Sequence, residues 1–92
     1  MAHMDIEGLA QSIDLAIGNE LRAQRLTKGL SREKLAADSG VSAKTIQRFE
    51  EAARSPNTKQ MAALTSALGI GLRTFLELAL KDIEHPTTSP SD

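Results

Sequence analysis

The sequence predicts an all-α domain of five helices, and three features of its 92 residues support this fold class. Residues that favour helices dominate the chain, and no segment alternates apolar and polar residues as a half-buried strand does. Apolar residues recur instead at the three-to-four-residue spacing of amphipathic helices. Glycine, proline and N-capping residues separate these apolar runs. A chain of this length forms one small domain, which we place at residues 5–84.

The first and longest predicted helix covers residues 5–27. Gly8 and Gly18 weaken its pattern, so a break near Gly18 is one interpretation of this segment. Lys28 and Gly29 end the helix with a positive charge and a left-handed cap. The apolar face of this helix consists of Ile6, Leu9, Ala10, Ile13, Ala16, Ile17 and Leu21.

Two short helices follow, each preceded by a serine that can cap it. Ser31 caps the second helix, which runs to about Ser39, and Gly40 provides the turn after it. Ser42 caps the third helix, at about residues 43–52. The two helices are therefore joined by a tight turn.

The last two predicted helices cover residues 58–68, capped by Asn57, and residues 72–84. The opening residues 1–4 are interpreted as a vector scar. The polar residues 85–92 are predicted to be a disordered tail.

The composition argues against several classes of function. The chain has no cysteine, which excludes disulfides, zinc–thiolate sites and thiol nucleophiles. His3 and His85 lie at the chain ends, so no histidine is expected to activate a serine or bind a metal in the folded part. No apolar run approaches the ~20 residues of a membrane span. We expect no catalysis, cofactor, metal or membrane insertion.

The charge distribution is compatible with a nucleic-acid partner, although the formal net charge is −1. Residues 18–60 carry nine basic and five acidic residues, a net charge of +4, whereas the rest of the chain carries −5. Local charge matters more than the total for binding a polyanion. Only two aromatic residues, Phe49 and Phe75, are present, which argues against single-strand binding by base stacking.

The second and third helices have the spacing of a helix-turn-helix. This motif needs a small residue on its first helix, a residue tolerant of positive φ in the turn, and a buried aliphatic residue on its second helix. Ala36, Gly40 and Ile46 meet these needs at spacings of four and six. Leu35, Val41 and Phe49 would extend the buried side. The residues left on the outer side of the third helix are Ala43, Lys44, Gln47 and Arg48.

The stretch "LSREKLAADSGVSAKTIQRFEEAARSP" resembles the phage repressor/Cro-type helix-turn-helix, also called the XRE family. The resemblance runs from about Ile17 to Leu76 and rests on the ordered set "LS", "LA…GVS…I…FE", "P" and "ALGI". It implies a lambda-repressor-like domain whose third helix is the recognition helix. Residues 5–16 would then be an N-terminal helical extension of the family core at residues 17–76.

The resemblance also implies roles for individual residues. Ala43 is small enough to touch a thymine methyl group but serves equally well as filler. Many family members have a glycine soon after Glu50, where this chain has Glu51-Ala52-Ala53, so we expect a slightly longer third helix. Arg25 and Glu50 would form a structural ion pair. The implied base-reading residues are Lys44, Arg48, Gln47 and Ala43, and the implied phosphate contacts are Arg32, Ser42, Thr45 and Arg54.

The function this implies is a sequence-specific regulator of transcription that binds double-stranded DNA. It would be a repressor acting as a homodimer on an inverted repeat, in the cytoplasm of a bacterium or encoded by a phage. The alternative is an antitoxin-like module that binds a toxin or another protein partner. Apolar residues beyond the needs of one small core suggest a dimer interface, and packing within the single chain is the alternative. They are Ile6, Leu9, Ile13, Leu78, Leu80 and Ile83.

Overall fold

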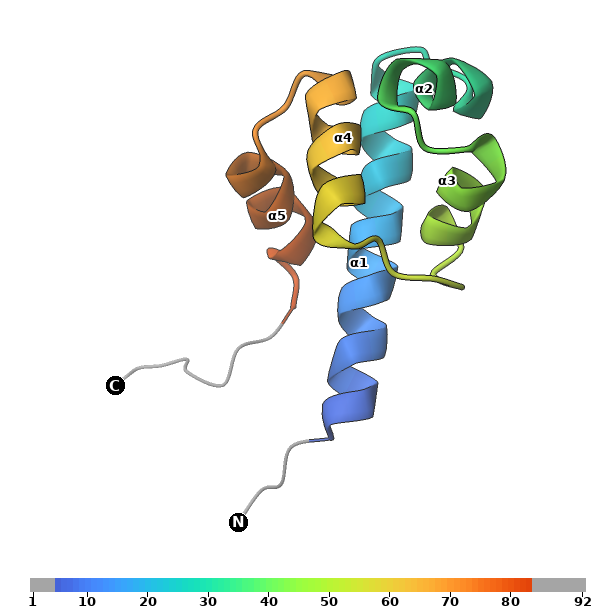
Figure 1. The fold of residues 1–92 in the computed structure, drawn as a ribbon. Coiled ribbons are helices and arrows are strands. Elements are labelled where there is room, and N and C mark those ends of the chain that lie inside the picture. The colour runs from blue at the N-terminus through green and yellow to red at the C-terminus, as the bar shows by residue number, and fades with distance from the viewer. Residues whose placement is uncertain (1–4, 84–92) are drawn as a thin grey trace.

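The computed structural model describes residues 5–83, which form five helices and no strand (Figure 1). The all-α, five-helix fold predicted from the sequence is confirmed. The predicted vector scar, the predicted tail and Glu84 lie outside the described residues. The helices are α1 (Ile6–Thr27), α2 (Arg32–Ser39), α3 (Ala43–Glu50), α4 (Thr58–Leu68) and α5 (Leu72–Leu80).

The first four helices begin where a polar side chain caps the backbone. Asp5, Ser31, Ser42 and Asn57 each accept a hydrogen bond from the backbone N–H three residues further along, at 2.8–3.1 Å. At α4 the side chain of Gln60 also accepts from the backbone N–H of Asn57, which completes a capping box. These local interactions explain why the sequence locates the helix starts well.

Two helix ends differ from the prediction. α3 stops at Glu50 rather than near residue 52, so the expectation of a longer third helix was wrong. Ala52 adopts the left-handed conformation with φ 58°, and its N–H donates to the Phe49 carbonyl. Ala53 N–H donates to the Arg48 carbonyl, so the pair closes α3 as a Schellman motif with alanine at the usual glycine position. α5 ends at Leu80, where a tight turn replaces the predicted continuation.

α1 is a single continuous helix, so the break considered at Gly18 does not occur. Gly18 is buried, and a Cβ atom placed there would lie 2.3 Å from the backbone oxygen of Phe49. At this glycine the backbone of α1 therefore lies in close contact with the backbone at the end of α3.

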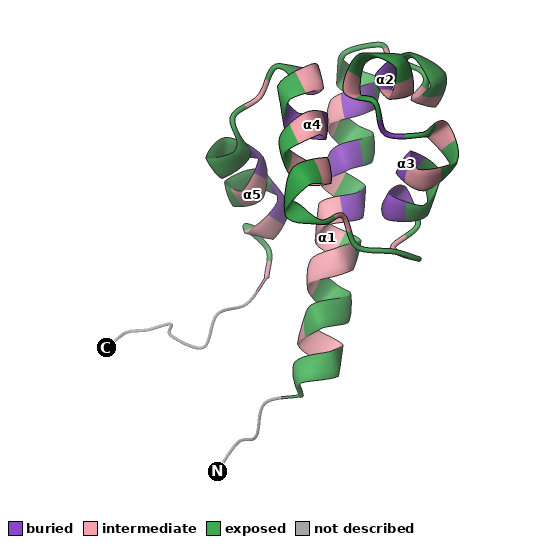
Figure 2. Cartoon of the chain, viewed as in Figure 1, coloured by how far each residue is buried: buried purple, intermediate pink, exposed green. Residues whose placement is uncertain are grey.

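The core lies where α1 meets α3 and α5, and where α2 packs on α3 and α4 (Figure 2). The predicted helix-turn-helix residues Leu35 and Ile46 are fully buried, and Ala36 is half-buried against the same cluster. The buried apolar residues are Leu21, Leu35, Val41, Ile46, Phe49, Leu64, Leu68, Phe75 and Ala79.

The N-terminal turns of α1 project beyond the other four helices (Figure 1). At about 1.5 Å per residue, the 22 residues of α1 span roughly 33 Å, more than the bundle can cover. Ile6 is 63% exposed and Leu15 is 51% exposed. The part of α1 that precedes the family core is thus a projecting arm with exposed and half-buried apolar side chains.

Two features of the described residues bear on other functions. No helix is by itself long and apolar enough to cross a membrane, although α4 and α5 together reach that length and composition as a pair bent by 98°. Within residues 5–83, no group of three or more histidine, aspartate or glutamate side chains is placed to hold a metal ion.

Candidate nucleic-acid interface

The turn between α2 and α3 fixes the angle of the candidate recognition helix. Gly40 ends α2 with φ 80°, and its N–H donates to the Ala36 carbonyl at 2.8 Å. Only two residues separate Gly40 from the start of α3, and Val41 among them is buried. Ile46 and Phe49 anchor the inner side of α3 in the core. The opposite side of α3 is consequently held towards solvent.

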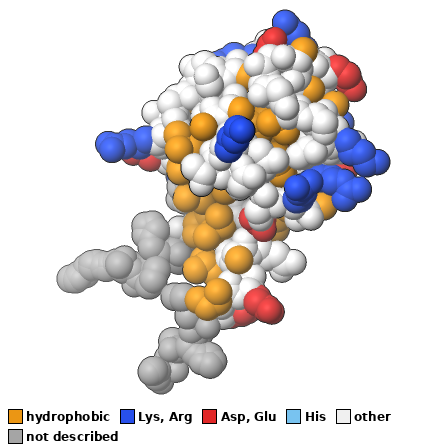
Figure 3. Space-filling view, viewed as in Figure 1, with side chains coloured by type: hydrophobic (Ala, Val, Ile, Leu, Met, Phe, Trp, Pro, Cys, Tyr) orange, Lys and Arg blue, Asp and Glu red, His pale blue; other side chains and the backbone are white. Residues whose placement is uncertain are grey.

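Lys44, Gln47 and Arg48 lie exposed on this outer side of α3. Together with Glu51 and Ala53 they line one shallow depression. Figure 3 shows lysine and arginine side chains gathered over α3 and the loop after it. Ala43, the fourth predicted base reader, is half-buried and does not line the depression. The structure therefore brings three of the four residues together.

Glu51 is a member of this surface to which the sequence analysis assigned no role. Its carboxylate Oε2 accepts a hydrogen bond from Gln47 Nε2 at 2.9 Å. The two residues are four apart, a spacing that brings side chains together on one helix face. That spacing was visible in the sequence and is the signal that could have identified the pair.

The hydroxyl groups at the start of α3 are linked to each other. Ser42 Oγ accepts from the Thr45 backbone N–H at 3.1 Å and donates to Thr45 Oγ1 at 2.9 Å. The hydroxyl hydrogen of Ser42 is thereby used within the protein, whereas that of Thr45 is left for an outside acceptor. Of the two predicted phosphate contacts, Thr45 is the better placed donor.

A buried ion-pair network joins α1, α2 and the end of α3. Arg25 Nε and Nη2 donate to the two carboxylate oxygens of Glu50 at 2.7 and 3.1 Å. Arg32 Nε donates to Glu50 Oε1 at 3.0 Å. Arg25 Nη1 also donates to the Leu30 carbonyl at 2.9 Å. The hydrogen bond from Glu50 raises the pKa of the Arg25 guanidinium above its ordinary value, so this cation keeps its charge inside the fold.

Arg32, a predicted phosphate contact, is therefore also a structural partner of Glu50. Its side chain is 34% exposed, whereas that of Glu50 is 1% exposed. The guanidinium thus lies at the protein surface at the start of α2 while its Nε is fixed from within. Such a fixed cation is well suited to a phosphate oxygen.

The loop after α3 carries Arg54 exposed at the surface, next to a contact that the sequence did not reveal. Ser55 Oγ donates to Asp14 Oδ1 at 2.6 Å, which ties this loop to the projecting half of α1. Asp14 and Ser55 are 41 residues apart, and neither belongs to a recognisable motif.

The predicted dimer residues fall into two groups. Ile6 is exposed, and Leu78 is 39% exposed. Leu80 packs partly against the core, which reduces its exposed surface. Leu9, Ile13 and Ile83 are likewise half-buried. Sequence reasoning missed Leu15 and Leu72, both of which are exposed.

Comparison with known proteins agrees with this geometry. Residues 21–75 match the family HTH_3, described as helix-turn-helix. The chain belongs to this helix-turn-helix family. The match spans all of α2, α3 and α4, so the resemblance to XRE-type domains seen in the sequence is confirmed.

Several similar proteins are named as regulators of transcription or of genes. Two uncharacterised HTH-type transcriptional regulators, from Rickettsia conorii and Rickettsia prowazekii, are each 32% identical over 78 residues, or 85% of this chain. The matched part is 62% and 59% of those proteins, so the chain spans about three fifths of the length of the curated relatives it matches. The crystal structure of the clp gene regulator ClgR from C. glutamicum superposes with a TM-score of 0.73 at 26% identity, covering 78% of this chain and 94% of that one.

Proposed function

We propose that this chain is a transcriptional regulator that binds double-stranded DNA by placing α3 in the major groove. The observation that carries the proposal is the outer side of α3, where Lys44, Gln47 and Arg48 project beside one another. An α-helix fits the major groove, and long donor side chains on its outer side reach base edges there. Lys44 and Arg48 are the base readers in this proposal, each directed at the acceptor atoms of guanine.

Phosphate contacts would come from the elements around α3. Arg32 at the start of α2, the Thr45 hydroxyl on α3 and Arg54 on the following loop form this set. Contacts of this kind set the register of the protein on the duplex but carry no sequence information of their own. The names of the Rickettsia relatives and of ClgR support a role in transcription.

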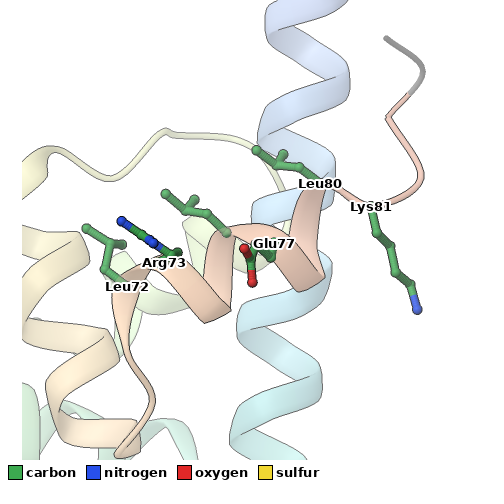
Figure 4. Close-up of a pocket in the computed structure, with 6 residues that line it drawn as sticks. Leu72, Arg73, Glu77, Leu80 and Lys81 are labelled. Carbon is green, nitrogen blue, oxygen red and sulfur yellow. The ribbon is translucent and has the colours of Figure 1, made fainter. Parts of the chain in front are cut away.

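The same proposal includes a homodimer that reads an inverted repeat and represses by occluding a promoter. Two apolar surfaces support it. One is a shallow face of α5 lined by Leu72, Leu76 and Leu80, with Arg73 and Glu77 beside it (Figure 4). The other is the projecting arm of α1, whose hydrophobic side chains are visible in Figure 3. Packing the arm of one copy on α5 of the other would remove both surfaces from water.

Selection of duplexes from a random library at about physiological salt tests DNA recognition, because purely electrostatic binding is weak there. The wild type should enrich an inverted repeat with half-sites about one helical turn apart. Lys44→Ala should lose about tenfold or more in discrimination at one position of each half-site. Arg54→Ala should weaken binding to all sequences alike and lower the salt dependence by about one phosphate contact.

Equal losses on selected and random DNA for Lys44→Ala would remove its role as a base reader. If the folded wild type enriches no motif, that result would favour the alternative function, an antitoxin-like module that binds another protein. In that case a stable complex with a second protein becomes the measurement of interest.

Sedimentation equilibrium at micromolar concentration tests the homodimer. We expect a dimer for the wild type and a shift to monomer for Leu72→Glu, because Leu72 is 40% exposed on the proposed α5 face and a buried, unpaired carboxylate there opposes association. Leu26→Glu is the matched control, since Leu26 is 51% exposed near the opposite end of α1. A wild type that is monomeric throughout, or a Leu26→Glu variant that dissociates as readily as Leu72→Glu, would refute this interface.

A further inference from the structure

Glu51 is out of place on a surface built to bind a polyanion. It follows α3 directly, is exposed, and lines the same depression as Lys44 and Arg48. A carboxylate at this place repels phosphate groups and lowers affinity for every DNA sequence alike. Base edges differ from phosphates in this respect, because adenine and cytosine present amino groups in the major groove that need an acceptor.

The hydrogen bond between Gln47 and Glu51 determines which end of the Gln47 amide faces outward. An ionised carboxylate can only accept hydrogen bonds. The amide nitrogen Nε2 must therefore be the atom that faces Glu51, at 2.9 Å, and the carbonyl oxygen Oε1 is directed away from it. Without such a partner, a glutamine can present either its donor or its acceptor end to a ligand.

We propose that Glu51 is a specificity-determining residue that holds Gln47 with its carbonyl oxygen ready to accept from the exocyclic amino group of adenine or cytosine. This inference rests on the proposed DNA-binding function. Guanine O6 and thymine O4 are acceptors, so at the same position they would face Gln47 Oε1 with no hydrogen between them. An unmade hydrogen bond in a desolvated interface is strongly unfavourable. Glu51 thus lowers the affinity for every DNA sequence but increases the discrimination between bases at one base pair.

The arrangement gives α3 two kinds of reader on one face. Lys44 and Arg48 can only donate, which matches guanine. Gln47, oriented by Glu51, supplies an acceptor between them along the helix. Each half-site should therefore contain one position with an amino-bearing base next to positions that favour guanine.

The test compares wild type, Glu51→Gln and Asp38→Asn, first by library selection. Each protein is then titrated with four duplexes that differ only at the base pair that Gln47 is proposed to contact. Glu51→Gln keeps the shape of the side chain, but its amide can pair with Gln47 in either orientation. Asp38→Asn is the matched control, because Asp38 is also an exposed carboxylate bonded to a residue four positions away, Lys34, but on α2. We expect the wild type to prefer adenine or cytosine about tenfold, and Glu51→Gln to bind all four duplexes within about twofold of one another. Asp38→Asn should keep the wild-type preference.

Gln47→Ala and the double variant Gln47→Ala/Glu51→Gln separate positioning from direct contact. If Glu51 acts through Gln47, adding Glu51→Gln to Gln47→Ala changes the base preference no further. A further change in that background would overturn the inference, as would a Glu51→Gln variant that only binds every sequence more tightly. A wild type that selects no motif would refute the proposed function itself. A wild type that selects a motif which Glu51→Gln reads with unchanged preference would refute this inference alone.

Discussion

Replacing Glu50 with alanine should lower the free energy of unfolding by about 3–5 kcal/mol. The side chain of Glu50 is 1% exposed and accepts hydrogen bonds from Arg25 and Arg32. Removing it leaves the Arg25 guanidinium buried without its counter-charge, and this unpaired cation is the source of the loss. A domain of this size has a total stability of only about 5–15 kcal/mol, so the variant should lose a third or more of it over most of that range.

Urea unfolding followed by circular dichroism measures this loss of stability. Two further variants serve as controls. Asp38→Ala breaks the exposed pair with Lys34, at 3.1 Å, and should change stability by no more than about 0.5 kcal/mol. Arg25→Met/Glu50→Leu removes the buried charges together and should be more stable than Glu50→Ala alone, because no uncompensated ion remains. The Leu30 carbonyl still loses its donor in the double variant, so full recovery is not expected.

A Glu50→Ala variant as stable as Asp38→Ala would show that the buried network contributes little. If the prediction holds, the network has a functional meaning as well. It connects α1, the start of α2 and the last residue of α3, and so fixes the proposed recognition helix against both of its supports.

The parts of the fold that local chemistry determines were predictable from the sequence. Ser31, Ser42 and Asn57 mark helix starts because each bonds a backbone N–H only three residues away. The residues on the outer side of α3 could also be predicted, because the spacing of Ile46 and Phe49 identifies the inner side. Grouping Lys44, Gln47 and Arg48 followed from that.

Features that depend on another part of the chain could not be predicted in the same way. The bond between Asp14 and Ser55 joins segments 41 residues apart, and neither residue type points to the other. The end of α3 was misjudged because Ala52 adopts a left-handed conformation that its own propensity disfavours. The two hydrogen bonds of the Schellman motif outweigh that preference.

At Gly18, helix propensity and the structure predict opposite effects of an alanine substitution on the free energy of unfolding. Alanine is favoured over glycine by about 1 kcal/mol in a helix interior, so propensity alone predicts that Gly18→Ala stabilises α1. In the structure the new Cβ atom would lie 2.3 Å from the Phe49 carbonyl oxygen and 3.1 Å from the Glu50 carbonyl oxygen. Both are backbone atoms, so the end of α3 would have to move away from α1.

We therefore expect Gly18→Ala to lower the free energy of unfolding by about 1–3 kcal/mol despite the gain in propensity. Gly8→Ala is the matched control on the same helix, because its new Cβ atom would meet the side chain of Asp5 and no backbone of another helix. Asp5 caps α1 through the residue-8 N–H, and a weakened cap would be roughly offset by the gain in helix propensity. Thermal unfolding of both variants should show a lower midpoint for Gly18→Ala and no comparable drop for Gly8→Ala. A Gly18→Ala variant at least as stable as the wild type would mean that α1 and α3 separate easily. The close approach at Gly18 would then not be what holds α3, and the core contacts of Ile46 and Phe49 together with the buried charges of Arg25 and Glu50 would have to do so.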